Sequence, residues 1–333
     1  MKLGTDYLNV EASNMKSNIQ IESKDIAKTH KNKYWRAFGH QRYLLAMLLP
    51  FLIWGFIFLY MPLYGWIMAF MRYSPGKPLF SNQWVGVEHF RVFLFESGEF
   101  WIVMRNSIVL SMLGLIFQLP LAVLLAIIIY ELPFRIFKRT VQTISYLPHF
   151  VSWVIVANLF FEIFSRQGVL NNLLLMLGIV REPIFFLGEP GLTWPILTAT
   201  RVWKGVGWDS IIFLGAISGI DPNLYEAAYV DGCNKFQRIR HITLPGIMPT
   251  VSVIIILSAG AILNTGFEQY YLFGTPANRL YSDVLDTYVY RYGLAMGQFS
   301  FATAVGMFKT ILSLIVLFTV NAIFKRTNDK SIF

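Results

Sequence analysis

The chain has 333 residues, of which 55% are hydrophobic and only 14% are charged, whereas soluble domains carry roughly 25% charged residues. This composition excludes an ordinary soluble domain, and the single cysteine, Cys233, excludes an intrachain disulfide. The net charge of +9 is not gathered in a basic stripe on a soluble domain, so it does not indicate nucleic-acid binding.

Residues 1–42 are polar, rich in lysine and asparagine, and lack the apolar core of a signal peptide. Their composition predicts a disordered or loosely helical cytoplasmic tail, with binding to the anionic membrane surface as the alternative. The last part, residues 31–42, mixes Tyr34, Trp35 and Phe38 with basic residues. Such a segment suits the lipid interface before the first span, so membrane lipid is an expected contact.

Six apolar segments follow, each long enough for a helix to cross a bilayer, which takes about 20 residues. They are residues 43–70, 102–130, 144–164, 192–220, 250–271 and 299–324. We therefore predict an all-α membrane protein with six transmembrane helices. Residues 43–324 form the membrane domain, and residues 325–333 form a cytoplasmic C-terminal tail.

Lysine and arginine gather on one side of these spans, as cytoplasmic loops require. With the N-terminus inside, the cytoplasmic segments hold 17 of the 28 basic residues and the outer loops hold seven. Both termini are then cytoplasmic, and so is a short basic loop at residues 131–142. The outer loop 71–101 is broken by Pro75, Gly76 and Pro78, and the outer loop 165–191 contains a short apolar stretch at 171–178.

The cytoplasmic stretch after the fourth span reads EAAYVDGCNKFQRIRHITLP over residues 226–245. Asp221 followed by Pro222 is a good helix start, and Gly232 is a good helix end. A second segment, 235–243, leads to Leu244 and Pro245, where we expect the chain to turn toward the fifth span. The first helix carries an apolar ridge and a single carboxylate in its body, Glu226, suited to a salt bridge with a partner. The ridge comprises Leu224, Tyr225, Ala228 and Tyr229.

Seven positions of this stretch have a fixed spacing: Glu226, Ala227, Ala228, Gly232, Ile242, Leu244 and Pro245. The spacing resembles the EAA loop of the membrane-spanning subunits of binding-protein-dependent ABC importers. The alternative is a self-contained amphipathic turn on the membrane surface. The resemblance implies the type I ABC importer permease fold, a bacterial cytoplasmic (inner) membrane location, and docking of residues 221–248 onto an ATPase.

The same resemblance implies the partners. They are a second homologous permease subunit, two ABC ATPase subunits and an extracytoplasmic solute-binding protein. No cofactor is expected in this chain, because ATP and Mg would be bound by the partner ATPase. The sequence agrees: it contains no G-x-x-x-x-G-K-[ST] phosphate loop and no clustered histidines, so it is predicted to be a transport subunit and not an enzyme.

Two glycine patterns lie in the fourth span. Gly205 and Gly207 form a GxG that follows no strand, so a dinucleotide site is not indicated. Gly215 and Gly219 form a GxxxG, which predicts close helix packing.

Charged residues inside the spans are the best pointers to a cargo, because such groups are costly in lipid. Arg201, Lys204 and Lys309 are the candidates, together with Glu268 and the aromatic Tyr270. One interpretation is ion pairing between helices, for example of Arg201 with Glu162 or Glu268. The other is a cationic pathway for an acidic cargo.

From residue 43 onward the chain is similar to the carbohydrate branch of these permeases, and within it to importers of complex oligosaccharides. The resemblance implies acidic cargo such as pectin, rhamnogalacturonan or alginate fragments. A same-family permease for a neutral sugar, peptide or amino acid stays open, as does a membrane channel or a membrane-embedded enzyme.

Overall fold

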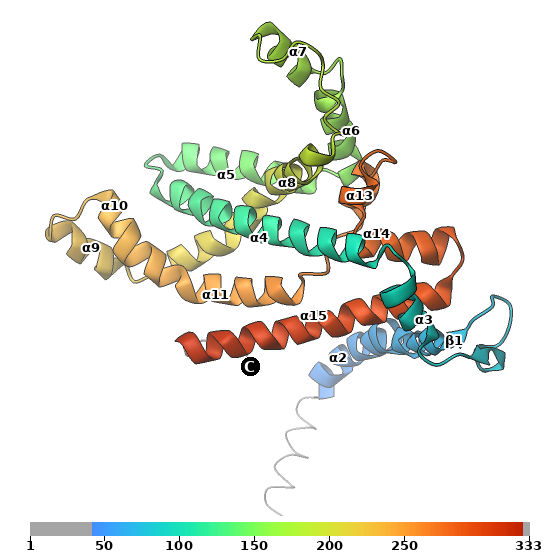
Figure 1. The fold of residues 1–333 in the computed structure, drawn as a ribbon. Helices are drawn as coiled ribbons and strands as arrows, with labels where there is room; N and C mark the ends of the chain where they lie inside the picture. The colour runs from blue at the N-terminus through green and yellow to red at the C-terminus, as the bar shows by residue number, and fades with distance from the viewer. Residues whose placement is uncertain (1–41, 329–333) are drawn as a thin grey trace, which may run out of the picture. The chain divides into compact units, whose positions relative to one another are not determined.

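The computed structural model describes residues 42–328, and this part of the chain is mostly helical (Figure 1). The predicted N-terminal tail, apart from its last residue, and positions 329–333 of the predicted C-terminal tail lie outside the described residues. The chain divides into two units, residues 1–65 and 66–333, and each is described by itself.

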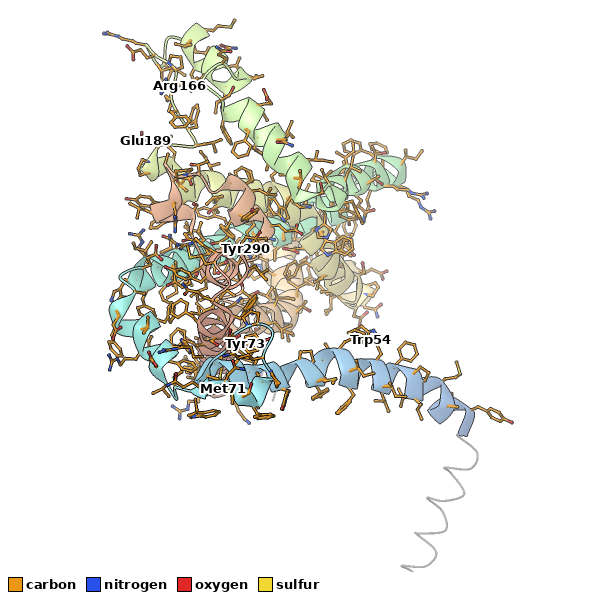
Figure 2. The ribbon with its side chains drawn as sticks, turned by 90° about the vertical axis from the view of Figure 1, so that its right-hand side faces the viewer. Trp54, Met71, Tyr73, Arg166, Glu189 and Tyr290 are labelled. Carbon is orange, nitrogen blue, oxygen red and sulfur yellow. The ribbon has the colours of Figure 1, made fainter. Side chains whose placement is uncertain are left out.

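The first unit contains a single apolar helical run. Helix α2 (Arg42–Gly55) continues into η1 (Phe56–Tyr60), a wide turn in which the Met61 N–H donates to the Phe56 carbonyl five residues back. The 3₁₀ segment η2 (Met61–Phe70) follows and extends into the second unit. Most side chains of this run are exposed, among them Trp54 (Figure 2). An exposed apolar helix of this length suits contact with lipid.

The second unit opens with a small hairpin, in which β1 (Met71–Arg72) pairs antiparallel with β2 (Gln83–Trp84). Four long helices then form the bundle: α4 (Phe100–Glu131), α8 (Pro190–Ser218), α11 (Leu244–Gly260) and α15 (Phe299–Asn328). Helix α4 packs mainly on α8, and α11 packs on α15. In Figure 1 the axes of α4, α11 and α15 are roughly parallel, and the chain runs along α11 in the opposite sense to α4 and α15.

Shorter elements connect these helices. They are η3 (Leu79–Ser81), α3 (Glu88–Arg91), η4 (Val92–Glu96), α5 (Arg135–Phe150), α6 (Trp153–Phe164), α7 (Val169–Met176), α9 (Pro222–Val230), α10 (Lys235–Arg238), η5 (Ile239–Thr243), α12 (Glu268–Phe273), α13 (Arg279–Ser282), α14 (Leu285–Tyr290) and η6 (Arg291–Ala295). Three apolar clusters fill the unit. The cluster around Phe213, Ile217 and Ile247 joins α4, α8 and α11, where small side chains on α4 permit close packing.

The predicted third span, 144–164, is not one helix. Helix α5 ends at Phe150, and α6 starts at Trp153, with the Ser152 hydroxyl accepting the Ile155 N–H as its N-cap. Pro148 and this cap interrupt the backbone ladder. The predicted basic loop 131–142 is also wrong, because α5 begins at Arg135 and only residues 132–134 are non-helical.

The predicted fifth span, 250–271, begins too late and ends too late. Helical structure is continuous from Lys235 to Gly260 and then stops, with Gly266 in the left-handed region at φ 95°. Five helical stretches of the described chain are long and apolar enough to cross a membrane: Ala46–Phe70, Phe100–Glu131, Trp153–Met176, Lys235–Gly260 and Phe299–Arg326. Helix α8 is as long, but charged residues in its middle make it less apolar. The count of six spans and the side of each terminus stay predictions.

Candidate functional site

Residues 221–234 form the first half of the predicted docking segment. Helix α9 starts as expected, with the Asp221 carboxylate accepting the Asn223 N–H at 3.0 Å and Pro222 in the first turn. Gly232 then adopts φ 75°, and the Cys233 N–H donates to the Ala228 carbonyl at 2.9 Å. This is the Schellman arrangement that a glycine after a helix end provides. The predicted start and end of this helix are confirmed.

A second helix follows at once and is tied to the first. Asn234 and Gln237 form a reciprocal capping box at the start of α10, with bonds of 2.8 and 2.9 Å. The Tyr225 hydroxyl lies 2.9 Å from the Thr243 hydroxyl and links the two helices. Burial raises the pKa of Tyr225, and its bond to Thr243 opposes the rise. The caps and this link make the segment a fixed helix–turn–helix.

The predicted turn at Leu244 and Pro245 is wrong. In η5 the Leu244 N–H donates to the Ile239 carbonyl, five residues back, and the chain continues directly into α11. A proline lacks the N–H and clashes with the preceding turn of a regular helix. The wide turn accommodates Pro245 without breaking the helix.

The surface of this segment is apolar where a partner would reach it. Ala228 is buried and Tyr225 half-buried, while Tyr229 is 74% exposed. The predicted ridge is therefore divided between the protein interior and the surface. Val230 is 85% exposed and Phe236 68% exposed. Exposed apolar groups gathered at one place indicate an interaction site.

The remaining motif positions differ in exposure. Glu226 and Ala227 are exposed, Leu244 and Pro245 are exposed, and Ile242 is half-buried. Among the described residues, none forms an ion pair with Glu226. Its carboxylate is therefore open to a partner.

A cavity of about 320 Å³ lies between α4, α8 and α11. Its polar lining includes Arg201, Asp209, Gln118 and Ser258. The Gln118 amide donates to the Asp209 carboxylate at 2.5 Å. The Arg201 guanidinium lies against Gly114, where a Cβ atom would be 3.1 Å from it, so the glycine makes room for the arginine.

Arg201 is the incompletely paired cation of this cavity. Its Nη1 is buried, and no group of the described chain accepts a hydrogen bond from it. The Gln118 Oε1 is likewise buried without a donor. Buried polar groups are normally paired, so Arg201 and Gln118 are two incompletely satisfied polar residues among those that line this cavity.

Lys204 does not line this cavity. Its ammonium donates to the carbonyls of His149 at 2.6 Å, Val151 at 2.7 Å and Pro148 at 3.3 Å, and lies 5.4 Å from the Trp153 ring centre. Lys204 thus holds the break between α5 and α6 together. Lysine donors satisfy the carbonyls that a helix end leaves free.

Lys309 also has a partner within the chain, because it forms an ion pair with Asp286 on α14. Glu268 is exposed at the start of α12, whereas Tyr270 is buried. The alternative pairing of Arg201 with Glu162 or Glu268 is not found among the ion pairs of the described residues. Among the described residues, the ion pair that involves one of the candidate cations is Lys309 with Asp286.

Gln118 is not among the site residues predicted from the sequence, and Asp209 was given no role in the site. Gln118 is a polar amide within the apolar run 102–130. A polar side chain in such a run indicates a site of interaction, and this was the signal in the sequence that could have identified it. Its pairing with Asp209 depends on α4 lying beside α8, which neither segment encodes alone.

Residues 118–330 match the model of the family described as the binding-protein-dependent transport system inner membrane component. Two relatives come from Bacillus subtilis (strain 168). Protein LplB is 39% identical over 89% of this chain and 93% of its own. The polygalacturonan/rhamnogalacturonan transport system permease protein YteP is 39% identical over 88% of this chain and 91% of its own.

A solved structure is similar over nearly the same length. It is a bacterial ABC transporter involved in the import of the acidic polysaccharide alginate, and one of its chains matches with a TM-score of 0.80 and 40% identity. The match covers 89% of this chain and 99% of that chain. A second structure of an alginate transporter, in complex with an alginate pentasaccharide-bound periplasmic protein, matches with the same TM-score. With its motif, its apolar helices and these matches, the chain belongs to the inner membrane component family of binding-protein-dependent transport systems and is a multi-pass permease subunit of an ABC importer.

Proposed function

We propose that this permease imports acidic oligosaccharides and forms half of the translocation pathway together with a second homologous permease. The similar transporters named for alginate and for polygalacturonan and rhamnogalacturonan support this cargo class, since all three are acidic. A solute-binding protein would deliver the cargo, as the complex of the alginate transporter with its periplasmic protein suggests.

Arg201 is the observation that carries the proposal. It lies near the middle of α8, is half-buried and is the cation that lines this cavity. A unit charge 4 Å from a carboxylate gains about 4 kcal/mol at an effective dielectric constant of roughly 20. Asp209, on the same cavity wall, limits that attraction, so an anionic chain can leave as well as enter.

The docking segment supplies the coupling part of the proposal. Two ATPase subunits would bind ATP and Mg, and this chain would contact one of them through Glu226 and the exposed side chains of Tyr229, Val230 and Phe236. The fixed helix–turn–helix would transmit the movement of the ATPase to α11, because helical structure is continuous from Lys235 to Gly260.

The test compares import of an acidic and a neutral oligosaccharide of equal length by the assembled importer in proteoliposomes. Arg201→Gln should slow acidic import about tenfold, the equivalent of one charge-assisted hydrogen bond, and leave neutral import nearly unchanged. Lys204→Gln is the matched control, because it removes a cation three residues away whose partners are carbonyls. It should lower both activities alike, in step with the amount of folded protein.

Two outcomes would overturn the proposal. A wild-type importer that transports the neutral chain as well as the acidic one would favour the neutral-sugar alternative. Equal slowing of both cargoes by Arg201→Gln would remove Arg201 from the recognition of charge.

A further inference from the structure

A second cavity lies at the end of the bundle remote from the docking segment. Helix α4 separates the two ends: Glu131 at its end lies 3.9 Å from Lys235 of α10, and Glu99 before its start pairs with Arg291 of η6. Its 32 residues extend about 48 Å at 1.5 Å per residue. Figure 2 shows the protein from the side on which α14 lies in Figure 1. Tyr290 is labelled near the centre of that view.

Aromatic rings form one wall of this outer cavity, whose volume is about 410 Å³, within the range of roughly 300–1,000 Å³ typical of ligand sites. Phe267 stacks on Tyr271 at 4.9 Å between ring centres, and Tyr290 lies 4.7 Å from Phe267 and 5.1 Å from Tyr271. Tyr271 and Tyr290 line the cavity, and Tyr271 is 50% exposed. A tyrosine offers an apolar face and a polar edge, and a sugar ring has the same two kinds of surface.

Charged residues also line this cavity, and their pairing is uneven. Arg291 contacts Asp283 at 2.5 Å and Glu99 at 3.3 Å, and its side chain is only 18% exposed. Arg279 reaches the same two carboxylates at 3.7 and 3.5 Å, and its side chain is 49% exposed. Burial raises the pKa of the Asp283 carboxyl, while the Thr287 hydroxyl and the Arg279 guanidinium oppose the rise. Arg291 is therefore a structural cation, and Arg279 is loosely held beside the aromatic wall.

We propose that this outer cavity is a binding subsite for one uronate residue of the oligosaccharide, with Tyr271 and Tyr290 against the sugar ring and Arg279 paired with its carboxylate. The arrangement matches a planar carboxylate with the forked donors of arginine. The proposal rests on the proposed function for its cargo. Buried Tyr270 lines the outer cavity and lies beside Arg201 of the inner one, so the two cation sites are neighbours along one route.

The experiment measures binding of a uronate trisaccharide to the assembled importer in nanodiscs by saturation-transfer NMR. An Arg201→Gln background isolates the outer cavity from the inner one. In that background, Tyr290→Ala and Arg279→Gln should each weaken binding about tenfold, the size of a lost charge-assisted bond or stacked ring. Tyr290→Phe and Arg279→Lys should retain most of it, because the ring or the charge remains.

Arg91→Gln is the matched control, because Arg91 is an exposed arginine paired with Glu96 and is not among the residues that line the cavity. This variant should bind as the parent does. Unchanged binding in both Tyr290→Ala and Arg279→Gln, in an importer that still transports acidic chains, would overturn the subsite and leave the proposed function intact. A wild-type importer that shows no preference for the acidic chain over the neutral one would instead overturn the proposed function. Thermal unfolding of each variant shows whether a loss reflects binding or folding.

Discussion

Two glycines decide how closely α8 approaches its neighbours. A Cβ atom at Gly207 would lie 1.8 Å from the Ser145 carbonyl oxygen of α5, and one at Gly205 would lie 2.5 Å from the Gln118 amide nitrogen of α4. At Gly215 nothing lies within 4 Å. The GxG pattern, and not the GxxxG pattern that predicts close packing, therefore marks the tight contacts within this chain. The same approach positions Gln118 beside Asp209 in the inner cavity.

Gly207→Ala should destabilise the protein, because the added methyl group meets backbone and not a flexible side chain. Overpacking of this kind lowers the free energy of unfolding by about 1–3 kcal/mol. Gly215→Ala, in the same helix, should leave stability unchanged or raise it by up to about 1 kcal/mol through helix propensity. Thermal unfolding in detergent measures both. Equal melting temperatures would show that α5 and α8 are not in contact at Ser145.

Lys309→Met should lower stability because it leaves the Asp286 carboxylate largely buried without its cation. Removing one partner of such a pair costs about 3 kcal/mol. The double variant Lys309→Met with Asp286→Asn should recover most of that loss, since no isolated charge remains. Both are followed by unfolding and by import of acidic and neutral chains. A double variant as unstable as the single one would mean that Lys309 acts through something other than this pair.

At the level of elements, wide helical turns recur before prolines. In η1 and in η5 the last N–H reaches a carbonyl five residues back, and Pro62 and Pro245 each follow two residues after the turn. Each wide turn keeps a long apolar helix continuous across a residue that would otherwise break it. Because α11 continues through Pro245 into the docking segment, that segment is fixed to a membrane helix and not hinged on it.

Gly232→Ala should uncouple ATP hydrolysis from transport, because φ 75° is strained for a residue with a Cβ. The strain, about 1–2 kcal/mol, would shift the helix–turn–helix from its docked form while the spans stay inserted. Gly76→Ala is the matched control, since Gly76 has φ 89° and open space around it in the loop 73–82. It should strain the outer loop equally and leave coupling intact. Cargo-stimulated ATPase activity of the assembled importer distinguishes the two, and equal stimulation in both would contradict the docking role.

The sequence predicted the elements whose signals are local. The caps at Asp221 and Gly232, the limits of α8 to within two residues and the start of α15 depend on residues within each segment. The end of α15 was predicted too early, because the helix continues through the basic residues 325 and 326 to Asn328. The break at Ser152 and the continuity through Pro245 were missed, because apolar length alone does not distinguish a broken helix from a continuous one. The role of Lys204 was also missed, since its acceptors are carbonyls 53 to 56 positions earlier in the chain. Contacts between residues so far apart in the sequence form only because α5 packs against α8, which the sequence of either helix does not predict.

At the scale of the whole molecule, charge marks the two ends of the second unit. The docking segment and the start of α5 carry exposed basic residues at one end, and the Glu99, Arg279, Asp283 and Arg291 network closes the other. Between them the inner cavity holds Arg201. In the proposed function, the cargo would pass from the outer cavity beside Tyr270 to Arg201, which lies against Gly114 near the middle of α4.

This route works only if the docking end is cytoplasmic, which labelling can test. In a Cys233→Ser background that retains import, Arg135→Cys places a thiol at the exposed start of α5, and Leu294→Cys places one at the far end, where the leucine is 69% exposed. A membrane-impermeant maleimide should label position 294 in intact cells and position 135 only after the membrane is opened. The basic residues of the docking end predict this orientation, because cytoplasmic loops carry an excess of positive charge. Both thiols should react in opened membranes, which excludes burial as the cause of a missing label. Labelling of position 135 from outside would reverse the orientation, and the outer cavity would then face the cytoplasm and could not receive cargo first.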